Sequence, residues 1–205
     1  MFSLSPVTLP DFVGSPLITV AVMKAHSRVV SSDEDDNLAG YLLAATERAE
    51  RDTHRSLGPQ VWKLVLDTFP YERNNWGFIS SAAIKLLKPP VTGVTSVKYL
   101  DPTGAQQTLV AGTDYIVDLD SLPPRIVPAY NTVWPSAQNY IKTVEVIYAA
   151  GYPANTCPAP ILQAIKLIAA TWYENRLDLV QGQANELPIP MSARSLLAQY
   201  AVRRF

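Results

Sequence analysis

The chain has 205 residues, of which 48% are hydrophobic and 17% charged, and this composition excludes a disordered protein. The formal net charge of −1 excludes an overall basic field that would attract nucleic acid. The single cysteine, Cys157, excludes an intramolecular disulfide. No apolar run approaches the ~18 residues of a transmembrane helix, so we expect no membrane partner. The first residues lack the pattern of a secretory signal, and we therefore expect assembly in a cytoplasm.

Residues 1–18 are predicted to form an extended N-terminal arm, because three prolines interrupt them and no helical or strand period runs through them. Phe2 and Leu4 are among several apolar side chains that make this arm too hydrophobic for a free tail. Two alternatives are open. The arm packs either on its own domain or on a neighbouring subunit.

Residues 19–59 are predicted to contain two helices. Thr19 suits the N-cap of the first, which runs through ITVAVMKAHSRVV. In the second, apolar side chains recur on one helical face, namely Leu38, Tyr41, Leu42, Ala45 and Ala49. Ser32 and Asp35 resemble a capping box, and the Gly58–Pro59 pair is a strong helix stop.

The second helix has acidic residues at its start and basic residues near its end, an order that suits the helix dipole. The basic residues are Arg48, Arg51, His54 and Arg55. The acidic run DEDDN also resembles the start of a calcium loop. However, Leu38 stands where that loop needs glycine, and Ala44 where it needs a bidentate glutamate. We therefore interpret the acidic run as a helix cap.

Residues 60–153 are predicted to form an inserted β domain of about six strands. The stretch VWKLVLD alternates with a period of two and places Trp62, Leu64 and Leu66 on one face. The turn Asp101–Gly104 has Asp, Pro and Gly where a type I turn favours them, which predicts a hairpin. Short strands between proline-rich turns are typical of an antiparallel sandwich or barrel.

Residues 154–205 return to helix and are predicted to complete a discontinuous helical domain with residues 19–59. Pro160 suits a first helical turn. The spacing of the next apolar residues makes one continuous stripe, formed by Ile161, Ile165, Ile168 and Trp172. A final helix is expected in MSARSLLAQYAVRRF. The fold class is therefore α+β, a helical bundle with an inserted antiparallel β segment.

The sequence offers little that indicates catalysis, and we predict no catalytic residue, no cofactor and no metal. His26 and His54 fall on different predicted helices, and Cys157 stands alone. Asp114, Asp118 and Asp120 share one face of a predicted strand, so a hydrolase with paired carboxylates stays an alternative. We favour a solvated outer strand face.

The polar end of the predicted helix over residues 159–176 contains a tryptophan, a tyrosine, a glutamate, an asparagine and an arginine. Trp172, Asn175 and Arg176 lie near one helical face, whereas Tyr173 and Glu174 turn away. The five side chains therefore do not converge on one small substrate. Amphipathic aromatics beside arginine favour a protein interface, with the rim of a helical bundle as the alternative.

Several stretches occur in an order that resembles a known family. They are VWKLVLDTFP, IKLLKPPVTGVTSVKYLDPTGAQQTL, DYIVDLDSLPPRIVPAYNTVWP and VEVIYAAGYP…CPAPILQAIKLIAATWYENR, with a closing ELPIP…ARSLLAQYAVRRF. Together they resemble the head–tail connector (adaptor) family of tailed double-stranded DNA phages, prophages and gene transfer agents. The resemblance runs from about Thr19 to Phe205.

The resemblance implies a structural protein of the virion neck, assembled in the host cytoplasm. It implies a homo-oligomeric ring, expected to be a dodecamer, that lies beneath the portal protein and extends the DNA channel. DNA would pass through without sequence-specific binding, and the tail or the next neck (stopper) protein would dock on the far side. Two alternatives stay open, namely another neck component such as a stopper or tail-completion protein, and a β-domain hydrolase or carbohydrate-binding module.

With this resemblance, three groups of residues become candidates for contacts. The candidates for portal binding are Arg194, Leu197, Tyr200, Arg203, Arg204 and Phe205. The candidates for the subunit interface are Phe2, Leu4, Trp172, Tyr173, Glu174 and Arg176. The candidates for a tail-side loop are Arg125, Tyr130 and Trp134. For the portal group the alternative is a solvated last helix whose basic end suits the helix dipole.

Overall fold

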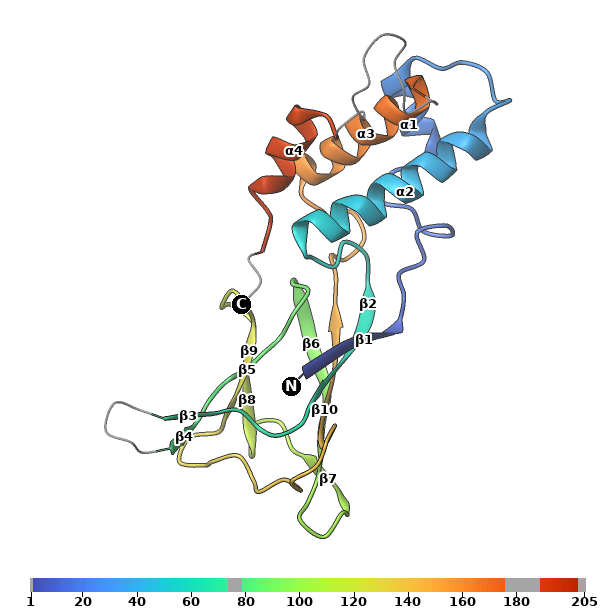
Figure 1. The fold of residues 1–205 in the computed structure, drawn as a ribbon. Coiled ribbons are helices and arrows are strands. Elements are labelled where there is room, and N and C mark those ends of the chain that lie inside the picture. The colour runs from blue at the N-terminus through green and yellow to red at the C-terminus, as the bar shows by residue number, and fades with distance from the viewer. Residues whose placement is uncertain (1, 74–78, 176–188, 203–205) are drawn as a thin grey trace, which may run out of the picture. The chain divides into compact units, whose positions relative to one another are not determined.

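The structure, a computed structural model, describes residues 2–73, 79–175 and 189–202 (Figure 1). The chain divides into two compact units, each made of two segments that are distant in sequence. We call Met1–Pro10 with Pro59–Gly151 the sheet unit, and Asp11–Gly58 with Tyr152–Phe205 the helical unit. The α+β class is confirmed. The predicted arm over residues 1–18 is divided between the two units.

The described strands of the sheet unit form three antiparallel sheets (Figure 1). The largest has the order β1-β2-β10-β6-β7, with β1 at Phe2–Thr8, β2 at Gln60–Leu66, β10 at Val144–Ala150, β6 at Val91–Leu100 and β7 at Gln106–Leu109. The second has the order β5-β9-β8, with β5 at Ile84–Lys85, β9 at Arg125–Pro128 and β8 at Tyr115–Asp118. The third pairs β3, Tyr71–Arg73, with β4, Ile79–Ser81. Strands β1, β3 and β4 lie outside the stretches that the sequence predicts as strands.

One core holds the two larger sheets together. Side chains of the five-stranded sheet, including Leu64, Val97 and Tyr148, pack in the same cluster as Ile84 and Ile126 of the three-stranded sheet. Tyr148 is fully buried, and its hydroxyl donates a hydrogen bond of 2.9 Å to the carbonyl oxygen of Leu87. Full burial of a large apolar side chain contributes about 1.5–3 kcal/mol to the stability of a fold. These buried residues therefore dominate the hydrophobic stabilisation of the sheet unit.

The predicted hairpin after β6 is confirmed, and Asp101 organises its turn. The Asp101 carboxylate accepts hydrogen bonds from the backbone N–H groups of Thr103 and Ala105, at 2.9 and 3.0 Å. It also accepts from the side chains of Thr103 and Gln107. These donors favour the ionised form and lower the pKa of Asp101 to about 2.

The N-terminal residues pack on their own chain. Strand β1 pairs with β2 in antiparallel register, with Phe2 opposite Leu66 and Leu4 opposite Leu64. Leu4 is partly buried against the core of the sheet unit, whereas the Phe2 side chain is 56% exposed. Of the two alternatives for the arm, the structure therefore has the intramolecular one over Phe2–Thr8.

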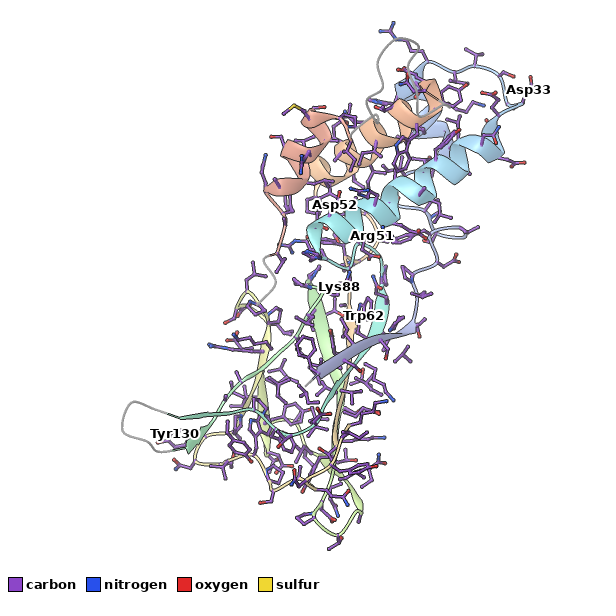
Figure 2. The ribbon with its side chains drawn as sticks, in the orientation of Figure 1. Asp33, Arg51, Asp52, Trp62, Lys88 and Tyr130 are labelled. Atoms are coloured by element: carbon purple, nitrogen blue, oxygen red, sulfur yellow. The ribbon has the colours of Figure 1, made fainter. Side chains whose placement is uncertain are left out.

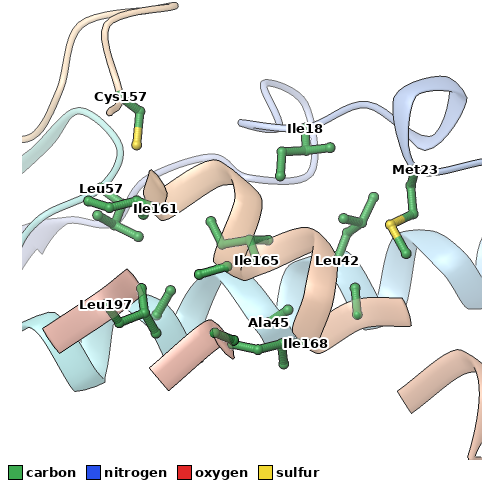
Figure 3. Close-up of a cluster of buried hydrophobic side chains, with 14 of the residues drawn as sticks. Ile18, Met23, Leu42, Ala45, Leu57, Cys157, Ile161, Ile165, Ile168 and Leu197 are labelled. Carbon is green, nitrogen blue, oxygen red and sulfur yellow. The ribbon is translucent and has the colours of Figure 1, made fainter. Parts of the chain in front are cut away.

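The helical unit contains four described helices around one apolar core (Figure 3). They are α1 at Val20–Ser27, α2 at Asp35–Thr53, α3 at Ala159–Glu174 and α4 at Met191–Ala198. The predicted stripes of α2 and α3 face each other, because Leu42 and Ala45 share the core with Ile161, Ile165 and Ile168. None of the described helices is long and apolar enough to span a bilayer.

The helix ends differ in part from the sequence predictions. Thr19 is the N-cap of α1, as predicted, and its hydroxyl oxygen accepts from the N–H of Val22 at 3.4 Å. The capping box of α2 was wrong, because the N-cap is Glu34 and it makes no side-chain capping bond. Helix α2 ends at Thr53, before the predicted Gly58–Pro59 stop, since His54 adopts the left-handed conformation at φ 54°.

Candidate functional site

A cavity of about 810 Å³ lies within the helical unit, and we call it the basic cavity because most of its charged lining residues are arginines. Helix α2 contributes residues from its last turns, α3 contributes Trp172, and α4 contributes Arg194. The full lining is Arg48, Arg51, Asp52, His54, Trp172, Ile189, Arg194, Leu197, Ala198 and Ala201. The basic residues near the end of α2 were visible in the sequence. No local sequence pattern indicated that Arg194 lies beside them in the fold.

The charges of the basic cavity are unequal. Arg48 and Asp52 pair along α2, with the Arg48 Nε 3.0 Å from both carboxylate oxygens. Among the described residues, Arg51 and Arg194 make no ion pair. The three guanidinium groups and the one carboxylate of the lining have a summed charge of +2. The cavity therefore attracts anionic groups.

The chain after α4 is fixed to the end of α2. The Arg55 Nε donates a hydrogen bond of 2.7 Å to the carbonyl oxygen of Tyr200. The backbone N–H of Val202 donates to the carbonyl oxygen of Thr53 at 2.9 Å. Arg55 also reaches the hydroxyl of Tyr152 at 3.5 Å, a phenol whose pKa is raised by burial. These contacts hold the wall of the basic cavity in place.

The predicted portal-binding residues have different environments. Arg194 is exposed and lines the basic cavity. Leu197 is only 3% exposed and packs in the helical core, although it also lines the basic cavity, and its portal-binding assignment stays a prediction. Tyr200 is half-buried and contributes its backbone carbonyl to Arg55. The remaining candidates lie outside the described residues, namely Arg203, Arg204 and Phe205.

The predicted subunit-interface residues of α3 also differ in their exposure to solvent. Trp172 and Tyr173 are half-buried and pack against the helical core, while Glu174 is exposed. Trp172, at the polar end of α3, and Arg194, in α4, both line the basic cavity. Arg176 lies outside the described residues. The interface assignments of these residues stay predictions.

The predicted tail-side loop contains one exposed aromatic residue and one buried one. Tyr130 is 88% exposed, and Figure 2 shows its position in the sheet unit. Arg125 forms an ion pair with Asp118 at 2.8 Å. Trp134 is 3% exposed, stacks on Phe69 with ring centroids 4.9 Å apart, and is therefore a core residue. A ring this buried offers little surface to a partner, and the tail-side assignment of Trp134 stays a prediction.

The predicted carboxylate face does not form a paired acid and base. Asp114 caps a turn, since its carboxylate accepts from the N–H of Val110 at 2.7 Å. Asp118 accepts from the Ser121 hydroxyl at 2.6 Å and from Arg125, and these contacts lower its pKa to about 2. A carboxyl group with such a low pKa stays ionised near neutral pH and is a poor general acid.

The remaining reactive groups are engaged in packing. Cys157 belongs to the helical core, and burial raises the pKa of its thiol to about 11, which disfavours the nucleophilic thiolate. Within the described part of the chain, no cluster of three His, Cys, Asp or Glu side chains is placed to hold a metal ion. Asp35, one of the calcium-like residues, instead pairs with Lys24 at 2.8 Å.

The fold defines the class of protein, an α+β chain in which a sheet unit and a helical unit are each built from two segments of the chain. Solved structures of this class include a chain from the neck of an empty gene transfer agent (GTA) particle, computed with C6 symmetry. That chain is 25% identical, the match covers 99% of this chain and 97% of that one, and the TM-score is 0.74.

Two further structures show the same likeness. A chain from the virion of a native GTA particle matches with 22% identity and a TM-score of 0.72, over 98% of this chain and 96% of that one. A chain from the neck of a native GTA particle, computed with C12 symmetry, matches with 24% identity and a TM-score of 0.69, over 99% and 97%. No protein-family model and no curated protein matches the chain. The resemblance indicated by the sequence is confirmed, because the chain shares nearly its whole fold with chains from GTA particles.

Proposed function

We propose that this protein is a structural component of the neck of a phage-like particle, and that it acts there as the head–tail connector. In this role identical copies form a ring beneath the portal, extend the DNA channel and present a docking surface to the tail. The observation that carries the proposal is the structural match over 99% of the chain to a protein from a GTA neck. Fold alone does not define function, but the likeness extends over 99% of this chain and 97% of that one and is not confined to one shared domain.

A ring is supported by the symmetry of the similar particles. The matching GTA necks were computed with sixfold and twelvefold symmetry, in which identical subunits repeat around one axis. Such subunits make heterologous contacts, in which one surface of each copy meets a different surface of the next. We expect twelve copies in the ring of this protein.

The portal-facing and tail-facing ends of the subunit are assigned as part of the proposal. We propose that α4 and the chain after it face the portal, since Arg194, Gln199 and Ala201 are exposed there and Tyr200 is half-buried. We propose that the Tyr130 loop faces the tail, because an aromatic side chain that is 88% exposed suits a protein contact. DNA would pass through the ring without base-specific contacts.

The experiment mixes the purified protein with its portal and counts rings on the portal by negative-stain electron microscopy. The proposal predicts one ring directly on each portal. If the protein instead joined only after a different ring was already bound, it would be a stopper or tail-completion protein. If it never joined a portal or a neck, the proposal would be wrong.

A shorter variant tests the portal-facing end without disturbing the core. Removal of residues 203–205 leaves Leu197 and the hydrogen bond between Val202 and Thr53 intact. We expect the truncated protein to fold with an unchanged circular dichroism spectrum and to bind the portal more weakly. Normal docking would contradict the assignment of this end.

A further inference from the structure

Helix α2 has opposite charges at its two ends, and both ends are accessible. Four consecutive acidic residues, Asp33 to Asp36, precede and begin the helix. The basic cavity lies at its other end. Figure 2 shows Asp33 and the pair Arg51 and Asp52 at opposite ends of the helix. A helix of 19 residues is about 28 Å long, so the two charged ends of one copy do not meet.

The acidic end has carboxylates that form no ion pair within the described part of the chain. Asp35 is paired with Lys24 at 2.8 Å. Asp33 is exposed and accepts a hydrogen bond of 2.7 Å from the neutral hydroxyl of Ser31. Asp36 is exposed in the first turn of α2 and forms no ion pair with a described residue. Asp33 and Asp36 therefore present negative charge to solvent.

The helix dipole explains only part of the basic end. Arg48, Arg51 and His54 lie near the C-terminus of α2, where the dipole favours positive charge. Arg194 lies in the first turn of α4, where the dipole favours negative charge. The dipole of α4 therefore does not account for a positive charge at Arg194. An anionic partner in the cavity would account for it.

The shape of the cavity favours a protein segment as that partner. Trp172, Ile189 and Leu197 add apolar surface beside the guanidinium groups. A volume of about 810 Å³ accommodates several side chains, which is more than a single small anion fills. Duplex DNA would present phosphates but no apolar side chains, so it matches the apolar part of the lining less well.

We propose that the acidic segment Asp33–Asp36 of one copy docks into the basic cavity of the next copy. The contact joins two different surfaces of identical chains, and repetition of such a contact around an axis closes a ring. This inference rests on the proposed ring function and names the surfaces that make the ring. Oppositely charged ends also specify the direction of assembly, because acidic ends repel each other and so do basic ends.

Two charge-reversed proteins test the contact. The first carries Arg48→Glu with Arg51→Glu, which leaves Arg194 and the proposed portal-facing end unchanged and so gives an acidic cavity. The second carries Asp33→Lys, Glu34→Lys and Asp36→Lys, which leaves Asp35 as the one acid beside three lysines and so gives a basic docking segment. We expect each protein alone to give at least about tenfold fewer rings on purified portals, because like charges then meet at every contact.

A mixture of the two proteins provides the decisive result. In an alternating ring each normal cavity receives a normal acidic segment, and each reversed cavity receives a reversed segment. An equimolar mixture is therefore expected to restore ring formation on portals in even-numbered rings. Wild-type rings should also dissociate as salt rises towards about 1 M, where charges are screened over about 3 Å.

Matched controls separate the contact from general charge effects. Glu47→Lys reverses an exposed acid of α2, and Lys166→Glu reverses a base of α3, and neither residue lines the cavity. Both controls should form rings as the wild type does, and all proteins should keep the wild-type melting curve within a few degrees. Failure of the mixture to assemble, although the wild type does, would overturn this inference alone.

Two other outcomes are equally clear. If the wild-type protein forms no ring on the portal, the proposed function fails, and the inference fails with it. If the reversed cavity leaves ring formation unchanged but weakens binding to a fluorescent 20-base-pair duplex, the cavity binds nucleic acid and the inference is wrong.

Discussion

At the residue scale, stacked aromatic side chains stabilise the sheet unit. Phe69 and Trp134 lie with ring planes 9° apart, and Tyr99 contacts Phe69 edge-on with centroids 5.6 Å apart. The Trp134 Nε1–H donates a hydrogen bond of 2.8 Å to the carbonyl oxygen of Ala82. The indole therefore joins segments that are 52 residues apart in sequence.

Substitution of Trp134 measures this contribution. Trp134→Ala should lower the free energy of unfolding by about 3–5 kcal/mol, because it removes a buried ring and leaves a cavity. Trp134→Phe should cost less, since a stacking ring remains, although the hydrogen bond to Ala82 and part of the buried ring are lost. Urea unfolding followed by circular dichroism measures both. A cost below about 1 kcal/mol for the alanine variant would show that Trp134 is not a core residue.

Asp118 gives a prediction for the dependence on pH. The Ser121 hydroxyl and then Arg125 stabilise its ionised form, so its pKa is lowered from 3.8 to about 2. A lowered folded-state pKa contributes stability that is full above about pH 4 and is lost as the pH falls through about 2. Carbon-detected nuclear magnetic resonance should give a carboxyl midpoint near 2. Ser121→Ala should raise that midpoint, and a wild-type midpoint near 4 would contradict the arrangement.

At the scale of single elements, α2 shows which features a sequence encodes locally. Its apolar face follows from the spacing of Leu38, Leu42, Ala45 and Ala49, because the period of the helix is an intrinsic property. Its ends do not follow in the same way. The helix stops where His54 adopts a positive φ, and the strong local stop at Gly58–Pro59 is not used. The exact ends depend on packing with the rest of the helical unit.

Two glycines give a matched prediction. Gly40 lies inside α2, and a Cβ atom built there meets nothing within 4 Å. Gly112 has equally open space but a φ of +83°, which strains an L-amino acid. Gly40→Ala should therefore raise the free energy of unfolding by about 0.5–1 kcal/mol, while Gly112→Ala should lower it by about 1 kcal/mol. Thermal melting measures both, and equal shifts of the same sign would contradict this account.

Strand pairing shows what local patterns leave undetermined. Strand β2 alternates clearly in sequence, but its partners β1 and β10 come from residues far along the chain. Strand β1 alternates apolar and polar residues only from Phe2 to Ser5 before Pro6 interrupts the pattern, and most of its side chains are exposed. Its pairing is determined by the backbone edge of β2, which no local pattern reveals.

The candidate site was predictable only in part for the same reason. The basic end of α2 was visible because Arg48 and Arg51 are close in sequence. Arg194 and Trp172 join them through the packing of α3 and α4 on α2, which a local pattern does not contain. Trp134 was likewise not recognised as a core residue, because it is buried by stacking on Phe69, which is distant in sequence.

At the scale of the whole molecule, the chain contains two compact units with separate cores. Asp118 is paired with Arg125 and Cys157 is buried, so neither is placed for catalysis. The prominent surface features are instead a charged cavity and an exposed aromatic loop. This combination supports a protein that works by contacts between macromolecules, as the chains from GTA necks suggest.

The central claim is that this protein is a connector in the neck, and imaging of particles made without it tests that claim most directly. Particles from cells that lack the gene would be purified and examined by electron cryomicroscopy, beside particles from cells in which the gene has been restored. The account predicts filled heads without a connector ring and without tails, and recovery of both on restoration. Complete necks and attached tails in the absence of the protein would contradict the account.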